Sequence, residues 1–165
     1  QDLTYWGLDG EELVTAWVAL SPSNPQSGCM KMLPGSHLEG EKPHHDTYRK
    51  NNILHRGQEL EMEVDDDKTV SIELQPGEAS LHHGWIAHAS YPNKSDDRRI
   101  GLSLQYLTPR MKQKKTERES VLPVRGQDRF NHFLPEPVCT NDFDPAMVTY
   151  QAESEILKHE VYDTD

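Results

Sequence analysis

The sequence predicts an all-β fold, a sandwich or barrel of short antiparallel strands, with long loops and a possible C-terminal helix. Runs rich in β-branched and aromatic residues recur over the first two thirds of the chain. Turn signals built from Pro, Gly, Asn and Asp separate these runs. The length of 165 residues corresponds to one domain. Many short strands with such turns are typical of a sandwich or barrel.

The strands are expected at residues 14–20, 29–33, 68–74, 79–83 and 98–107. The run over 68–74 alternates clearly, with Val70, Ile72 and Leu74 on one face of the strand. Residues 39–56 are polar and irregular, which predicts a long surface excursion. After residue 108 the strand pattern breaks up, and only residues 144–160 could be helical.

Composition excludes several classes of partner. The net charge of −11 argues against nucleic acid and anionic membrane surfaces, and no apolar run is long enough to cross a membrane. Cys29 and Cys139 lie far apart and are expected to be reduced thiols of a cytoplasmic protein. The hydrophobic content of 34% is low, so we expect preceding polypeptide to complete the core.

An arginine-bearing face is expected near residues 98–105. If residues 86–91 pair with 98–103 across the turn at 92–97, His88 and Arg99 lie opposite each other. Alternation then places Arg99 on one face with Gly101, Ser103 and Gln105. A guanidinium above small and polar groups suits a small dianionic ligand. On the hairpin alone, a surface residue in a charge-rich turn, like its neighbour Arg98, is the favoured interpretation of Arg99.

Three histidines within seven residues are candidate metal ligands: His82, His83 and His88. A ligand that meets Asp2 from another strand should lie at a strand end, beside the turn that leads to Arg99. His88 satisfies this condition. We therefore expect His88 and Asp2 to converge on one point, and His82 and His83 to point elsewhere.

A series of short motifs occurs in a characteristic order and spacing. They are Gln1-Asp2-Leu3-Thr4-Tyr5-Trp6, Ala16-Trp17-Val18-Ala19-Leu20, Gly28-Cys29-Met30, Leu33-Pro34-Gly35-Ser36-His37, Pro76-Gly77-Glu78, residues 83–93 from His83 to Asn93, and Arg99-Ile100-Gly101-Leu102. Together they resemble the phytanoyl-CoA dioxygenase family, and more closely its bacterial members. The resemblance covers about residues 1–110 and continues more weakly through 124–128.

The resemblance implies a double-stranded β-helix, a cupin-like jelly roll, that holds Fe(II) near its mouth. Residues 1–110 would be the C-terminal part of the jelly-roll catalytic domain, and residues 111–165 a loop-rich extension of it. The implied metal ligands are Asp2 and His88, with a third ligand, a histidine directly before Gln1, absent from this chain. Arg99 would bind the distal carboxylate of 2-oxoglutarate, with these residues around it: Gln1, Trp17 and Ser90.

The implied function is an Fe(II)- and 2-oxoglutarate-dependent dioxygenase. It would hydroxylate an unidentified small molecule with O2 and release succinate and CO2, while 2-oxoglutarate chelates two open metal positions. Related halogenases have a small residue in place of the carboxylate ligand, so Asp2 favours hydroxylation. A degenerate, non-catalytic jelly-roll binding protein is the alternative, and a cupin-type enzyme with another metal is a third. The position of Arg99, eleven residues after His88, argues against the third. The sequence does not indicate the oligomeric state.

Overall fold

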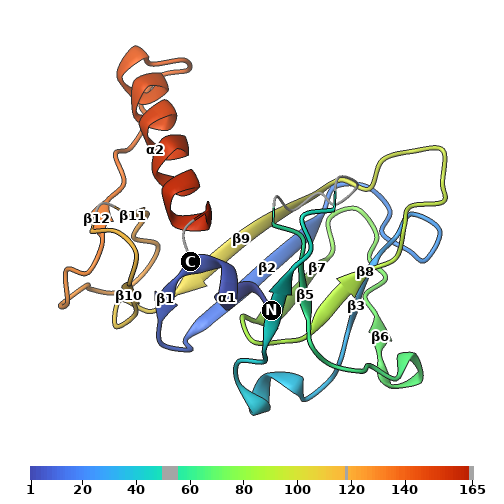
Figure 1. Ribbon diagram of the computed structural model, residues 1–165. Helices are drawn as coiled ribbons and strands as arrows, with labels where there is room; N and C mark the ends of the chain where they lie inside the picture. Colours follow the sequence, from blue (N-terminus) through green and yellow to red (C-terminus); the bar gives the residue numbers. More distant parts are fainter. Residues whose placement is uncertain (50–55, 118, 164–165) are drawn as a thin grey trace. The chain divides into compact units, whose positions relative to one another are not determined.

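The computed structural model describes residues 1–49, 56–117 and 119–163 and is built mainly from short strands (Figure 1). The α-helices are α1 (Asp2–Trp6) and α2 (Pro145–Asp163), and short 3-10 turns cover Ser36–Glu39 and Asp66–Lys68. The strands are β1 (Leu8–Asp9), β2 (Leu13–Ala19), β3 (Met30–Met32), β4 (His44–Asp46), β5 (Gln58–Leu60), β6 (Val70–Ser71), β7 (Ala79–His83), β8 (His88–Ser90), β9 (Gly101–Leu107), β10 (Lys112–Gln113), β11 (Ser120–Val121) and β12 (Leu134–Pro135).

The chain divides into two compact units. The first contains Gln1–Asp2 and Glu12–Leu107, and the second contains Leu3–Glu11 and Thr108–Asp165. Grouping Leu3–Glu11 with the C-terminal part was not expected, because this segment pairs with residues distant in sequence: β1 is antiparallel to β10, with Leu8 opposite Gln113.

Strand β2 is the centre of the larger sheet, which has the order β7-β2-β9 (Figure 1). Both pairings are antiparallel, and they place Thr15 opposite His82 on one side and opposite Gln105 on the other. Thr15 is 2% exposed, and Leu13 and Ala19 are also buried. Because directly opposed residues share a face of the sheet, these registers decide which side chains meet near Thr15.

A second sheet has the order β6-β3-β8, again antiparallel. Its central strand contributes Met30 and Met32 to a buried cluster with Ile86. Trp17 from β2 and Ile72 pack against this cluster. The apolar contacts therefore join the two three-stranded sheets of the first unit, as expected when each sheet must bury one face.

Several expected elements are confirmed. The strands expected over 14–20, 29–33 and 79–83 correspond to β2, β3 and β7, and the possible helix over 144–160 corresponds to α2. The run over 68–74 is a strand only at β6, after which Ile72 and Leu74 continue with isolated backbone bonds to Met30 and Ser23.

Two expectations about strands are wrong. Residues 86–91 and 98–103 do not form a hairpin: β8 pairs with β3 and β9 with β2, so the intervening segment crosses between sheets. The excursion over 39–56 is not wholly irregular either, since β4 pairs with β5, and residues 50–55 lie outside the described residues. Long-range pairing decided both cases, and local turn signals do not encode it.

The second unit holds the β1–β10 pair, a parallel pair of β11 and β12, and helix α2. Within the described residues, no helix is long and apolar enough to cross a membrane. Cys29 is buried and Cys139 is exposed, and both are free thiols.

Gly28 is predicted to be intolerant of any side chain. Its φ is +75°, and an added Cβ would lie 2.5 Å from the backbone oxygen of Tyr91. Gly77 has a φ of +91° but open space around its Cα. Gly77→Ala should therefore cost only the left-handed backbone penalty, about 1–2 kcal/mol, whereas Gly28→Ala should cost more because backbone must also move. Urea denaturation measures both, and equal losses would contradict the steric argument.

Candidate functional site

Asp2 is the centre of a cluster of polar side chains in the first unit. It is the first residue of α1, and its side chain is 23% exposed. The hydroxyl of Thr15 on β2 donates to Asp2 Oδ2 at 2.9 Å. This bond ties the start of the chain to the central strand of the larger sheet.

His88 faces the same carboxylate, as the sequence predicts. Its Nε2 lies 3.4 Å from Asp2 Oδ1, and its Nδ1 lies 3.0 Å from the carbonyl oxygen of Ile86. A carbonyl can only accept, so we assign the ring proton to Nδ1. The lone pair of Nε2 is then directed to the side of Asp2, which is the arrangement of a metal-binding histidine oriented by a backbone carbonyl.

His82 also faces Asp2, which corrects the expectation that it would point elsewhere. Its Nε2 lies 3.7 Å from Asp2 Oδ2, and its ring centroid lies 5.6 Å from that of His88. The cause is the register of β7, which places His82 directly opposite Thr15. Strand pairing, which the spacing of the histidines does not reveal, brings this residue into the site.

His83 points away from Asp2, as expected. Its Nδ1 accepts a hydrogen bond from the backbone amide of Trp85 at 3.1 Å, and its ring lies 5.4 Å from that of His37. Adjacent residues of a strand project to opposite faces, so His82 and His83 cannot both join the cluster.

The charge states in the cluster suit a divalent metal. Burial alone would raise the pKa of Asp2, but His82, His88 and Thr15 outweigh it and hold that pKa below its usual value. Burial lowers the pKa of His88, although Asp2 opposes this effect. At neutral pH the carboxylate is therefore ionised and the His88 imidazole neutral, which are the forms that ligate metals.

Asp2 and His88 do not complete a ligand set by themselves. Among residues 1–49, 56–117 and 119–163, no group of three or more His, Cys, Asp or Glu side chains has an arrangement that could hold a metal ion. The described part of the site therefore contains two candidate ligands, Asp2 and His88, with His82 beside the same carboxylate.

Arg99 presents an unsatisfied guanidinium. Its Nη2 donates to Ser90 Oγ at 3.4 Å, whereas Nη1 is buried with no hydrogen-bond partner among the described residues. Burial also lowers the pKa of Arg99, despite the opposing influence of Cys29. A buried guanidinium nitrogen without a partner is costly, so this group is suited to receive an anion such as a carboxylate.

The indole ring of Trp17 lies against the guanidinium of Arg99. The Arg99 guanidinium carbon lies 5.3 Å from the centroid of the Trp17 ring, within the range of a cation–π contact. Gly101 makes room for the indole, since a Cβ there would lie 2.0 Å from Trp17. Arg98 is exposed, with its backbone carbonyl accepting from the Ser21 hydroxyl. The two arginines therefore differ in burial, with Arg98 exposed and Arg99 partly buried, although the hairpin used to place His88 beside Arg99 is absent.

The side-chain amide of Gln1 is hydrogen-bonded to the main chain. Its Nε2 donates to the carbonyls of Gly40 at 2.9 Å and Trp85 at 2.7 Å, and its Oε1 accepts from the amide of Lys42 at 2.9 Å. Both amide protons are used, so contact with a co-substrate would have to break one of these bonds. These hydrogen bonds fix the position of the main chain directly before Asp2.

Comparison with known proteins identifies the family of this chain. The profile of the family "Phytanoyl-CoA dioxygenase (PhyH)" matches residues 1–101, and the chain belongs to this family. Human peroxisomal phytanoyl-CoA dioxygenase is 29% identical over 64% of this chain and 32% of its own length. The 1-deoxypentalenic acid 11-beta-hydroxylase of Streptomyces arenae is 29% identical over 86% of this chain and 46% of its own.

Solved structures of non-heme oxygenases are also similar to this chain. The apo form of ThoJ, a non-heme monooxygenase, superposes with a TM-score of 0.84 and 34% identity over 99% of this chain and 58% of its own. EvdO2 from Micromonospora carbonacea var. aurantiaca, in complex with 2-oxoglutarate, has a TM-score of 0.55 and 30% identity over 64% of this chain and 42% of its own. The chain thus spans between about a third and three fifths of the length of these proteins.

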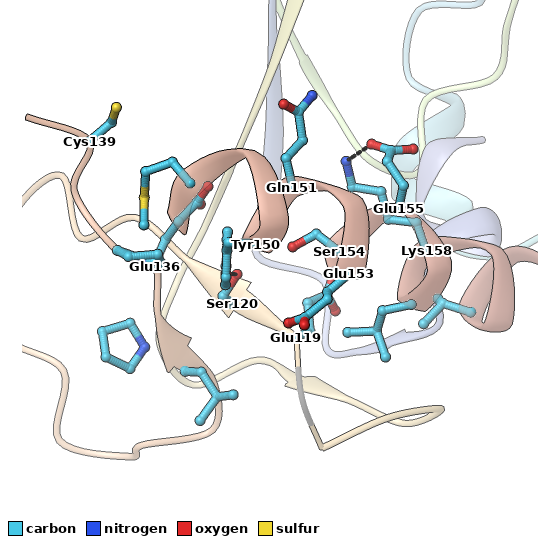
Figure 2. Close-up of a pocket in the computed structure, with 16 residues that line it drawn as sticks. Glu119, Ser120, Glu136, Cys139, Tyr150, Gln151, Glu153, Ser154, Glu155 and Lys158 are labelled. Atoms are coloured by element: carbon cyan, nitrogen blue, oxygen red, sulfur yellow. Dashed lines mark hydrogen bonds and ion pairs between the residues drawn. The ribbon is translucent and has the colours of Figure 1, made fainter. Parts of the chain in front are cut away.

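A separate pocket lies in the second unit, between α2 and the segments at 119–120 and 134–139 (Figure 2). No feature of the sequence predicted a site at this pocket. Lys158 and Glu155 form an ion pair at 3.0 Å, and the hydroxyls of Ser120 and Tyr150 are in contact. Glu119 is half-buried, and burial raises the pKa of its carboxyl group despite a hydrogen bond from Gln113.

The ionised, half-buried carboxylate of Glu119 should lower the free energy of unfolding at neutral pH. Its folded-state pKa lies above the ordinary value of 4.5, so the folded protein binds the proton more tightly than the unfolded chain. The free energy of unfolding then falls as pH rises from about 4.5 through the folded pKa. Glu119→Gln should raise the melting temperature by a few degrees at pH 7 and lose that advantage near pH 4. The exposed Glu136 provides the control, and a gain independent of pH would contradict burial as the cause.

Proposed function

We propose that this protein is an Fe(II)- and 2-oxoglutarate-dependent oxygenase that hydroxylates a small molecule. The proposal rests on two observations. The Asp2 carboxylate and a neutral His88 face each other, and the Arg99 guanidinium has a buried nitrogen without a partner among the described residues. The first suits Fe(II), and the second suits the distal carboxylate of 2-oxoglutarate. Family membership and the 2-oxoglutarate-bound EvdO2 structure support this combination.

The fold in this proposal is a double-stranded β-helix. Two three-stranded antiparallel sheets share an apolar cluster, and the site residues lie on β2, β7, β8 and the segment before β9. This arrangement supports a jelly roll of which the described residues form a part. We place the activity in the cytoplasm, in line with the reduced thiols expected from the sequence.

Each residue has a defined role. Asp2 and His88 would hold the iron together with a histidine directly before Gln1. Arg99 would bind and orient 2-oxoglutarate, with Trp17 excluding water from the guanidinium face and Ser90 holding Nη2. When bound, the iron supplies the O2 chemistry, and oxidative decarboxylation of 2-oxoglutarate to succinate and CO2 accompanies substrate hydroxylation.

The direct test is formation of succinate by the full-length protein. With Fe(II), 2-oxoglutarate and O2, the protein should produce succinate, and production should rise in the presence of a substrate from a small-molecule screen. Asp2→Ala and His88→Ala should abolish it. Succinate formation that persists in both variants would sink the assignment of the iron site.

Arg99, and not Arg98, should control the affinity for 2-oxoglutarate. A charge-assisted bidentate pair contributes roughly 1.5–3 kcal/mol, so Arg99→Ala should raise the KM for 2-oxoglutarate at least about tenfold. Arg98→Ala is the matched control, because it removes the exposed guanidinium of the directly preceding residue. Steady-state kinetics with 2-oxoglutarate as the varied substrate measure both, and the reverse pattern would exchange the two roles.

The carboxylate of Asp2 should restrict the enzyme to hydroxylation. With Asp2 occupying its metal position, no vacancy remains for a halide once 2-oxoglutarate and O2 are present. Mass spectrometry of turnover products in chloride buffer should show a gain of oxygen and no chlorine. A chlorinated product from the unmodified protein would contradict both the ligand assignment and the hydroxylase proposal.

A further inference from the structure

The two oxygens of Asp2 lie in different surroundings. Oδ1 faces Nε2 of His88 at 3.4 Å. Oδ2 receives the Thr15 hydroxyl at 2.9 Å and lies 3.7 Å from Nε2 of His82. One oxygen is therefore on the ligand side, and the other is surrounded by protein donors.

His82 is held rigidly in this position. Its side chain is 4% exposed, and its place opposite Thr15 is set by the pairing of β7 with β2. Its Nδ1 is buried and has no partner among the described residues, so no acceptor there stabilises a proton. Nε2 is the ring nitrogen that faces the Asp2 carboxylate, and we therefore assign an N–H to it.

We propose that His82 is a positioning residue that, with Thr15, holds Oδ2 of Asp2 away from the metal, so that Asp2 binds through Oδ1 alone. This inference rests on the proposed function, because it presupposes that Asp2 ligates the iron. It goes beyond that function by giving a role to a histidine that neither the spacing of the motifs nor the resemblance assigned.

One-oxygen binding has a chemical consequence. A carboxylate that bound through both oxygens would occupy a position that 2-oxoglutarate or O2 requires. Donors on Oδ2 oppose that second bond, and they also fix the orientation of the carboxylate before metal arrives. Partners of this kind change metal affinity or activity by about 10–100-fold when they are removed.

The test compares variants of the full-length protein by calorimetric titration with Mn(II) and by the visible absorption of the anaerobic Fe(II)–2-oxoglutarate complex. His82→Phe should weaken Mn(II) binding about 10–100-fold and shift the absorption band. His82→Gln should restore most of both, because its carboxamide N–H can reach Oδ2. His82→Asn, with a shorter side chain, should not. Thr15→Val removes the other donor at nearly constant volume and should weaken Mn(II) binding in the same direction.

His83→Phe is the matched control, since it makes the same change one residue along on the opposite face of β7. It should leave Mn(II) affinity and the absorption band unchanged. If His82→Phe does not fold, as judged by circular dichroism, the contrast between His82→Gln and His82→Asn carries the test.

Two results would overturn the proposal. Wild-type Mn(II) affinity and an unchanged band in His82→Asn would show that His82 does not act on the carboxylate. Loss of binding as complete as in Asp2→Ala, without rescue by His82→Gln, would make His82 a metal ligand. Failure of the proposed function is a separate result, because the unmodified protein would then bind neither Mn(II) nor 2-oxoglutarate with Fe(II).

Discussion

Strand β2 has to satisfy hydrogen bonds along both of its edges, and the two antiparallel registers that result determine the surroundings of the site. On one side, β7 sets His82 opposite Thr15, and on the other, β9 sets Gly101 opposite Ala19 and Ser103 opposite Trp17. A slip of one residue in either pairing would turn every side chain of that strand to the other face. The cluster at Asp2 and the support of Arg99 by Trp17 therefore depend on the same strand.

The two ends of the site differ in how well their charges are satisfied. The Asp2 carboxylate has a hydroxyl donor and two neighbouring imidazoles, and its lowered pKa reflects this stabilisation of the charged form. Arg99 instead keeps a buried nitrogen without a partner among the described residues. A folded protein tolerates such a group at a free-energy cost that a bound anion can remove. The carboxylate end is thus preorganised, while the arginine end keeps a buried donor that an anion can satisfy.

Gln1 shows how the backbone around the site is fixed. Its three hydrogen bonds to the main chain at Gly40, Lys42 and Trp85 connect the start of the chain to two separate loops. Because Asp2 follows directly, these bonds restrict the direction in which its carboxylate can point. The side chain of Gln1, which the resemblance placed beside the co-substrate, is therefore bonded to the main chain next to Asp2.

The sequence alone determined the strand-rich class, the positions of β2, β3, β7 and β9 and the C-terminal helix, because alternation and turn chemistry are local properties. It also identified the phytanoyl-CoA dioxygenase family, and the resemblance pointed to Asp2 and His88 as candidate metal ligands. Only the tertiary structure decided that β8 and β9 belong to different sheets, that His82 faces Asp2, and that the amide of Gln1 is taken by backbone. Each of these depends on pairing between segments far apart in sequence, and the energies that select such pairings come from burial and register across the sheet, which a single strand does not carry.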